Sequence, residues 1–368
     1  MRIPHFDLKP AAEELAPELL ARWSDLVART SFVGGPEVEG FEAGFATYLG
    51  AAGCVAVANG TDALVVALRA LDLRPGDEVL LPSFTFFATA EAVVWAGGVP
   101  VPVDIDAATF NIDVADAAAR ATSRTVGIIP VHLYGQPCDL DAVSELCARR
   151  GWWFVEDAAQ AHGALWRGRR VGTFGALAGW SFYPSKNLGC FGDGGAITGA
   201  DGGALARARL LANHGRVEHY RHGAVGTNSR LDALQAAVLN LRLGRLERDN
   251  ARRAALVARY RETLAGVGDL RFAAAPAAAT PVWHQLTVRT AARDALRAHL
   301  QGAGIGSATF YPIPVHQQPA MQELLPSGLE LPAAEAAARE VLCLPLFPQL
   351  AEAQVDEVCA CVRAFFGD

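Results

Sequence analysis

The sequence predicts an α/β protein with a largely parallel β-sheet covered by helices on both faces, followed by a smaller α+β domain. Three observations support this prediction. First, short β-branched runs alternate with amphipathic Ala- and Leu-rich runs as far as Asp157. Second, these runs are separated by Gly, Pro, Asn and Asp residues. Third, shorter units follow from about Gly266. With 368 residues, of which 51% are apolar, the chain can form a large core and a second domain.

The elements of the first region follow in order along the chain. The expected strands are CVAVA (54–58), EVLLP (78–82), VPVPVDID (99–106), TVGIIPV (125–131) and WWFVED (152–157). The amphipathic runs between them are ALVVALRAL (63–71), ATAEAVVWAG (88–97) and LDAVSELCARR (140–150). Strands that alternate with helices form βαβ units, and such sheets bind ligands at the carboxyl ends of their strands.

The later elements mark a change of organisation. After AGWSFYP (178–184) and GGAIT (194–198), one long helix is expected from near Arg230 to about Leu264. The units beyond it are LRFAA, the strand-like VWHQLTVRT, the helical ARDALRAHLQGAG, TFYPIP and a last helix after LPLFPQL. We therefore predict a large domain over residues 1–264, which includes the N-terminal segment and the long helix, and a small α+β domain over 265–368.

Composition restricts the partners. A net charge of −7 and a pI near 5.7 predict no general attraction to nucleic acid or to an anionic membrane, so the expected partner is a small molecule. The sequence lacks a signal-peptide pattern and an apolar run of membrane-spanning length, which favours the cytoplasm. Seven cysteines without a CxxC pair indicate buried reduced thiols rather than disulfides or a zinc site, and no metal site is expected.

Several residues near the ends of the expected strands could bind a ligand or take part in catalysis. Asn59, Gly60 and Thr61 follow a strand and open a helix, which directs free backbone N–H groups at a bound anion, and Ser181 can add a hydroxyl to that cradle. The turn that contains Phe86 places an aromatic ring where it can stack on a flat ligand. Each feature also has an ordinary structural explanation, as a turn, a cap or a core residue.

An acid and a lysine complete the pattern. Asp157 ends an apolar strand, where a carboxylate needs a partner such as the protonated ring nitrogen of pyridoxal phosphate, or else caps a helix. Lys186 lies in SFYPSKNLGCFGDGGAI, in surroundings too apolar for a solvated cation, and a dehydrated lysine can condense with an aldehyde. The combination of cradle, aromatic ring, acid and lysine on one sheet favours a pyridoxal-phosphate site.

These segments resemble the DegT/DnrJ/EryC1/StrS aminotransferases, which are sugar aminotransferases with the fold type I pyridoxal-phosphate architecture. The resemblance extends over nearly the whole chain and includes GPEVEGFEAGFATYLG, ANGTDAL, GDEVLLPSFTFFATAEAV, PVPVDID, HLYGQPCDLD, VEDAAQAHGA, SFYPSKNLGCFGDGGAI, TNSRLDALQAAVL, YPIPVHQQPA and LPLFP. It implies a mostly parallel seven-stranded sheet sandwiched by helices. The cofactor would be pyridoxal 5'-phosphate, with pyridoxamine 5'-phosphate as the intermediate form.

The resemblance also implies roles for individual residues. Lys186 would form the Schiff base and move protons, and Asp157 would pair with the ring nitrogen. Gln160 would lie near the phenolic oxygen, and Phe86 would stack on the ring. The phosphate would be bound by Gly60, Thr61 and Ser181 together with Asn228 of a neighbouring subunit, so that a homodimer shares its active sites.

The resemblance further implies the reaction. An amino group, with glutamate as the expected donor, would pass to a nucleotide-linked keto-sugar, and the similarity of the motifs points to C3. A dTDP-3-keto-6-deoxyhexose and a UDP-2-acetamido-3-keto-glucuronate both remain open. Arg230 is the candidate cation for a uronate carboxylate, and Tyr311 and His316 are candidate sugar contacts. The retained lysine disfavours the branch in which histidine replaces it and the reaction becomes dehydration.

Alternative functions are a non-catalytic regulatory or sensing member of the same fold and a nucleotide-4-keto-sugar aminotransferase. The retained lysine, acid and anion cradle argue against the sensing module.

Overall fold

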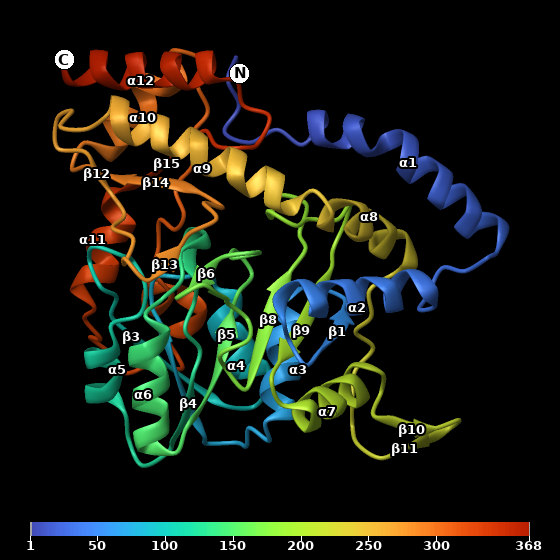
Figure 1. Ribbon diagram of the computed structural model, residues 1–368. Coiled ribbons are helices and arrows are strands. Elements are labelled where there is room, and N and C mark those ends of the chain that lie inside the picture. The colour runs from blue at the N-terminus through green and yellow to red at the C-terminus, as the bar shows by residue number, and fades with distance from the viewer. Residues whose placement is uncertain (1, 368) are drawn as a thin grey trace.

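A seven-stranded sheet forms the centre of the computed structural model, which describes residues 2–367 (Figure 1). In spatial order its strands are β1 (Gly53–Val57), β9 (Gly195–Gly199), β8 (Leu177–Ser181), β5 (Trp153–Asp157), β4 (Thr125–Ile128), β2 (Glu78–Pro82) and β3 (Val99–Val103). Only β9 runs antiparallel to its neighbours. The mostly parallel sheet is therefore confirmed, and the carboxyl ends of all its strands but β9 meet at one edge.

The two faces of the sheet are covered by different helices. Alternate residues of each strand point to opposite faces, as Cys54 and Ala56 do against Val55 and Val57. The face that carries Val55 and Val57 packs on α3 (Gly60–Ala70), α4 (Ala88–Trp95) and α7 (Gly202–Ala212). The other face packs on α2 (Pro36–Leu49), α5 (Val114–Arg120), α6 (Leu140–Arg150) and α8 (Ala233–Leu243). The expected sandwich of helices around the sheet is thus observed.

The long helix predicted from near Arg230 to Leu264 is wrong in detail, because it consists of two helices. The first, α8, begins only at Ala233, and the second, α9, spans Leu246–Thr263. Gly244 lies between them, and glycine has the lowest helix propensity after proline. The break lets α8 pack on α2 while α9 continues toward α12 (Glu352–Phe366), as Figure 1 shows.

The C-terminal region is built on a second, three-stranded antiparallel sheet. Its elements are β12 (Arg271–Phe272), β14 (Leu286–Arg289), β15 (Val341–Leu344), α10 (Arg293–Gly302), α11 (Pro332–Glu340) and α12. Its core also includes Ile3, Leu256 and Tyr260, which come from the segment assigned to the large domain. The N-terminal segment and the end of α9 therefore pack on the small unit, and the boundary at residue 264 stays a prediction.

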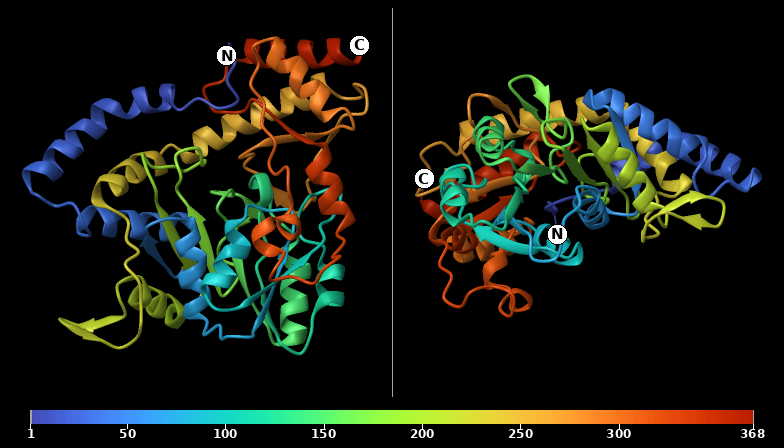
Figure 2. Two further views of the ribbon diagram at one scale, coloured as in Figure 1. Left: turned by 180° about the vertical axis from the view of Figure 1, so that it is seen from behind. Right: turned by 90° about the horizontal axis from the view of Figure 1, so that it is seen from below.

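The remaining elements lie at the periphery. They are α1 (Lys9–Ala28), the hairpin of β10 (Arg216–Glu218) and β11 (Arg221–His222), and the small sheet of β6 (Leu165–Trp166), β7 (Arg169–Arg170) and β13 (Ala279–Thr280). Figures 1 and 2 show α1 and the β10–β11 hairpin extending from the body of the molecule. All seven cysteines are free thiols, and all but Cys361 are buried. Within residues 2–367, no helix is both long enough and apolar enough to span a bilayer.

Candidate active site

A cavity of about 710 Å³ lies at the carboxyl edge of the large sheet. Its walls come from the ends of β5 and β8, the first turn of α3, the turn before α4, and two segments of the small unit, 284–285 and 310–311. The predicted residues that line it are Gly60, Thr61, Phe86, Asp157, Gln160, Ser181, Lys186 and Tyr311. The residues of the large sheet meet here because each follows the end of a strand or opens a helix at that edge, and Tyr311 joins them from the small unit.

Lys186 lies on the turn that follows β8. Its backbone N–H donates to Tyr183 O at 2.8 Å, which fixes the turn. Burial lowers the pKa of the Lys186 ammonium from 10.5 to about 8, and the nearby Asp157 carboxylate opposes this shift. A lysine with such a pKa is partly neutral at physiological pH and can therefore act as a nucleophile and a base.

Asp157 is held at the end of β5 by two hydrogen bonds. Thr89 Oγ1 donates to one carboxylate oxygen at 2.8 Å, and the Ala159 backbone N–H donates to the other at 3.2 Å. Burial nevertheless raises the pKa of Asp157 above its usual value, so the carboxylate is suited to a cationic partner in the cavity. Its neighbour Glu156 is also buried, and its carboxylate lies 3.0 Å from His132 Nε2, which indicates a structural role.

The anion cradle is formed by the start of α3 and the end of β8. Asn59 caps the helix, since its side chain accepts the Asp62 N–H at 2.8 Å. The N–H groups of Gly60 and Thr61 precede the first helical hydrogen bond, which Ala63 N–H donates to Asn59 O, and both residues line the cavity. A Cβ at Gly60 would lie 2.6 Å from the Ser181 Cβ, so only glycine permits this close approach of helix and strand.

The opposite side of the cavity carries an amide and two aromatic rings. Gln160 Oε1 accepts the Tyr134 backbone N–H at 2.7 Å, which leaves Nε2 as the donor, 3.1 Å from the Tyr311 hydroxyl. Phe86 is 55% exposed, and its ring centroid lies 5.8 Å from that of Tyr311. An apolar ring with this exposure is available to stack on a planar ligand.

Three predicted residues do not line this cavity. Asn228 and Arg230 are exposed, on the segment between the β10–β11 hairpin and α8. His316 is buried elsewhere, with Nδ1 at 2.6 Å from Ser83 Oγ and Nε2 at 3.2 Å from Glu335 Oε1. Both ring nitrogens of His316 are thus engaged by the protein, and the structure offers no support for its contact with a sugar.

The sequence analysis missed Thr89, which contacts Asp157, and His284, which lines the cavity. Thr89 lies in the first turn of α4, and its bond to Asp157 depends on how α4 packs on the sheet. His284 lines the cavity from the small unit, whereas the sequence analysis treated it only as part of a strand-like run. A histidine within the strand-like run VWHQLTVRT was the only available signal, and it did not specify a location.

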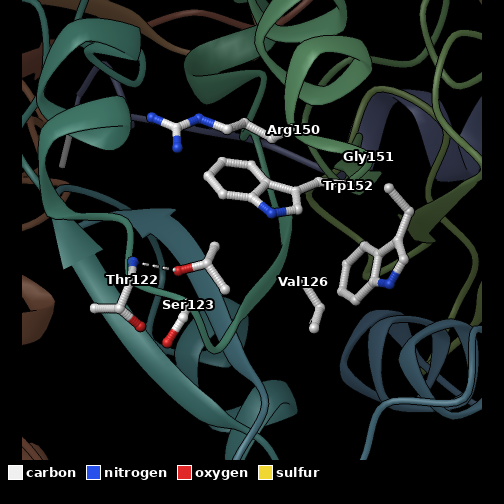
Figure 3. A pocket seen from close by; sticks show the side chains of 8 residues that line it. Thr122, Ser123, Val126, Arg150, Gly151 and Trp152 are labelled. Atoms are coloured by element: carbon white, nitrogen blue, oxygen red, sulfur yellow. Dashed lines mark hydrogen bonds between the residues drawn. The ribbon is translucent and has the colours of Figure 1, made fainter.

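A second cavity, of about 460 Å³, lies at the opposite edge of the sheet, beside the first residues of β4 and β5. Figure 3 shows Arg150 and Trp152 on one side of it and Thr122 and Ser123 on the other. Arg150 is its only charged lining residue within the described chain. Since this cavity collects none of the candidate residues, the catalytic chemistry is assigned to the carboxyl edge.

Comparison with protein families agrees with this geometry. The model of the DegT/DnrJ/EryC1/StrS aminotransferase family matches residues 14–363. A dTDP-3-amino-3,4,6-trideoxy-alpha-D-glucose transaminase of Streptomyces venezuelae is 47% identical over 98% of this chain and 96% of its own length. A UDP-2-acetamido-2-deoxy-3-oxo-D-glucuronate aminotransferase of Pseudomonas aeruginosa is 40% identical over 97% of this chain and 99% of its own.

Solved structures show the same architecture with ligands bound. The S. venezuelae protein DesV, in complex with a ketimine intermediate, superposes with a TM-score of 0.97 at 46% identity, and the match covers 100% of this chain and 99% of the other. The Bacillus subtilis protein NtdA with bound cofactor PMP superposes with a TM-score of 0.92 at 31% identity, covering 100% and 85%. Both matches extend over the region that forms the cavity.

Proposed function

Because the chain belongs to the DegT/DnrJ/EryC1/StrS aminotransferase family, we propose that this pyridoxal-phosphate enzyme aminates C3 of a nucleotide-linked keto-sugar. The observation that carries the proposal is Lys186, a buried lysine with a lowered pKa, in one cavity with an anion cradle and a buried acid. The names of both relatives above place the amino or oxo group at C3 of a nucleotide sugar, which supports this position.

The residues present fit pyridoxal phosphate. Gly60 and Thr61 open α3 beside Ser181, so their free backbone N–H groups suit a phosphate, and the buried Asp157 in the same cavity suits a protonated ring nitrogen. When bound, the cofactor supplies an aldehyde that carries the amino group and a ring that withdraws electrons. The protein then has to bind, orient and exchange protons.

Each of the four residues Asp157, Lys186, Gln160 and Phe86 has a distinct role in this proposal. Asp157, ionised beside a cation and oriented by Thr89, would keep the proton on the ring nitrogen. Lys186 Nζ, with a pKa of about 8, would accept a proton at physiological pH and return it within one catalytic cycle. Gln160 Nε2 would donate a hydrogen bond to the phenolic oxygen, and Phe86 would hold the ring in place by stacking.

We propose glutamate as the amino donor and a homodimer as the active form. Lys186 is the only cationic side chain that lines the cavity within residues 2–367. A nucleotide diphosphate or a uronate carboxylate therefore calls for further cations or donors, and a second copy can supply them from the exposed Asn228 and Arg230. We also propose a cytoplasmic location, which suits seven free thiols.

The test is a screen of the purified enzyme in its pyridoxamine form against nucleotide-linked 3-keto and 4-keto sugars, with mass spectrometry of the products. Amination of a 3-keto sugar, with return of the pyridoxal absorbance, is expected for the wild type and not for Lys186→Ala. Reduction with borohydride should attach the cofactor covalently at Lys186, which peptide mapping can locate.

The alternatives give different results in the same screen. Exclusive amination of 4-keto sugars would show that the enzyme acts at C4 of the sugar rather than at C3. Ligand binding without product from any sugar or amino donor would favour the sensing role and contradict the proposal. A dTDP-linked neutral sugar and a UDP-linked uronate are distinguished by which of the two is turned over.

A further inference from the structure

His284 lines the cavity but has no role in the mechanism above. It lies two residues before β14, and its backbone N–H donates to Tyr134 O at 2.8 Å, which ties this segment to the turn that follows β4 of the large sheet. Its side chain is 5% exposed and faces the same space as Lys186. The state of its two ring nitrogens can be derived from the neighbouring hydrogen bonds.

A chain of amides fixes what surrounds Nδ1. The Val282 carbonyl oxygen can only accept, so the atom of Asn187 that lies 2.9 Å from it must be the amide nitrogen, Nδ2. This nitrogen also donates to Asn250 Oδ1 at 2.9 Å, and Asn250 Nδ2 donates to the His162 carbonyl oxygen at 2.8 Å. Asn187 must therefore direct its Oδ1 at His284 Nδ1, 3.2 Å away.

The tautomer of His284 follows from this contact. Since Asn187 Oδ1 is an acceptor, Nδ1 must carry the hydrogen. Burial, together with the positive charges of Lys186 and Arg253, lowers the pKa of His284 well below its usual value, so the ring is neutral. A neutral imidazole has a single N–H, and Nε2 is therefore unprotonated.

Nε2 is left as an acceptor toward the cavity, since no group within residues 2–367 makes a hydrogen bond to it. A bound molecule that contacts it must bring an O–H or N–H group, and a carboxylate is unsuited. We infer that His284 is a positioning residue that accepts, through Nε2, a hydrogen bond from a hydroxyl group of the bound keto-sugar. This inference rests on the proposed sugar substrate, whose hydroxyl groups distinguish it from glutamate.

Two substitutions separate the functions of the two nitrogens. Asn in place of His284 puts an amide nitrogen near the position of Nδ1, which keeps the bond to Asn187 but removes the cavity acceptor. Gln puts its amide oxygen near the position of Nε2 and can keep the acceptor. His299→Gln, on the exposed surface of α10, is the matched control.

The two half-reactions are measured separately on the holoenzyme by stopped-flow absorbance. His284→Asn should raise the KM for the keto-sugar about tenfold, as expected for one lost hydrogen bond, and leave the glutamate half-reaction unchanged. His284→Gln should recover most of the loss, and His299→Gln should match the wild type. Equal losses in both half-reactions would overturn the inference, because they indicate a bond to Lys186 instead.

Nitrogen NMR of histidine-labelled enzyme gives a readout independent of activity and of the stability of the variants. The wild type should show His284 with Nδ1 protonated and Nε2 bare, and the Nε2 resonance should shift when the keto-sugar nucleotide binds but not with glutamate. A protonated Nε2 or an unshifted resonance would overturn the inference. Sugar amination with an unchanged KM in His284→Asn would refute only the role of His284, whereas no amination of any sugar would overturn the proposed function and this inference together.

Discussion

Burial moves the pKa values of Lys186 and Asp157, which line the same cavity, in opposite directions. It lowers the pKa of Lys186 to about 8 and raises that of Asp157, so it favours the neutral form of each. The neutral form is the reactive one for a lysine that attacks an aldehyde. For Asp157 the ionised form is the useful one, and a cationic ring nitrogen would restore it.

The lowered pKa of Lys186 predicts how cofactor capture depends on pH. Only the neutral amine attacks an aldehyde, and the neutral fraction rises with pH until the pKa is passed. The rate at which cofactor-free protein captures pyridoxal phosphate should therefore rise up to about pH 8 and then level off. Stopped-flow absorbance measures it, with an N-acetyl-lysine amide as the reference amine. A rate that rises steadily toward pH 10.5, the ordinary lysine value, would contradict the shift.

The charge of Asp157 predicts the effect of Asp157→Asn. The amide keeps the size and can keep the contact with Thr89, but it cannot hold the ring nitrogen protonated. Turnover should fall at least about 100-fold, roughly 2.7 kcal/mol, in samples matched for bound cofactor by absorbance. Asp201→Asn, at the N-cap of the remote α7, is the control and should keep full activity. Near-normal turnover of Asp157→Asn would reduce the acid to a structural role.

The helices α3 and α7 differ in the surroundings of their first turns. The first turn of α3 faces β8 and the cavity, whereas the first turn of α7 faces open space, although both helices begin at a glycine after a side-chain cap. The same local pattern, a capping side chain followed by glycine, therefore forms a candidate phosphate site at the start of α3 and an ordinary exposed surface at the start of α7. The difference comes from the element that packs beside the helix end.

This contrast predicts the effect of one methyl group at each glycine. Gly60→Ala places a Cβ 2.6 Å from the Ser181 Cβ and must displace the start of α3, which should raise the dissociation constant of pyridoxal phosphate about tenfold or more. Gly202→Ala, whose Cβ has no neighbour within 4 Å, should bind the cofactor as the wild type does. Absorbance titration of cofactor-free protein compares them. Equal affinity for pyridoxal phosphate in both variants would show that Gly60 is not part of the phosphate site.

Several large apolar side chains are exposed on the surface of the molecule. Leu20 and Val27 of α1, with Phe32 and Val33 after it, are largely exposed, and the β10–β11 hairpin extends away from the core (Figure 2). Asn228 and Arg230 lie near the hairpin and outside this chain's own cavity. These features suit the proposed homodimer, in which each copy completes the cavity of the other.

Subunit mixing tests the shared site. Lys186→Ala and Asn228→Asp should each be inactive, the second because its carboxylate repels the phosphate. In a mixed dimer one site collects both lesions and the other neither, so activity should return to about a quarter of wild type per total subunit. The measurement is turnover after subunit exchange, verified by tagged copies. No recovery despite exchange would place Asn228 in its own subunit's site or away from any site.

The sequence by itself determined the sheet and the residues at its carboxyl edge. Lys186, Asp157 and the turn at Gly60 could be located because each follows a strand end or opens a helix, and the parallel order of strands brings such positions together. That information is local in the chain. The physical rule that connects the local segments is the common direction of parallel strands.

Only the tertiary structure decided the remaining contacts. Thr89 reaches Asp157 because α4 packs against the sheet, His316 is held by Ser83 and Glu335, and the tautomer of His284 depends on side-chain amides from two other segments. These features join residues that lie far apart in the sequence, and no spacing or periodicity encodes such contacts, because they arise only when whole elements pack together.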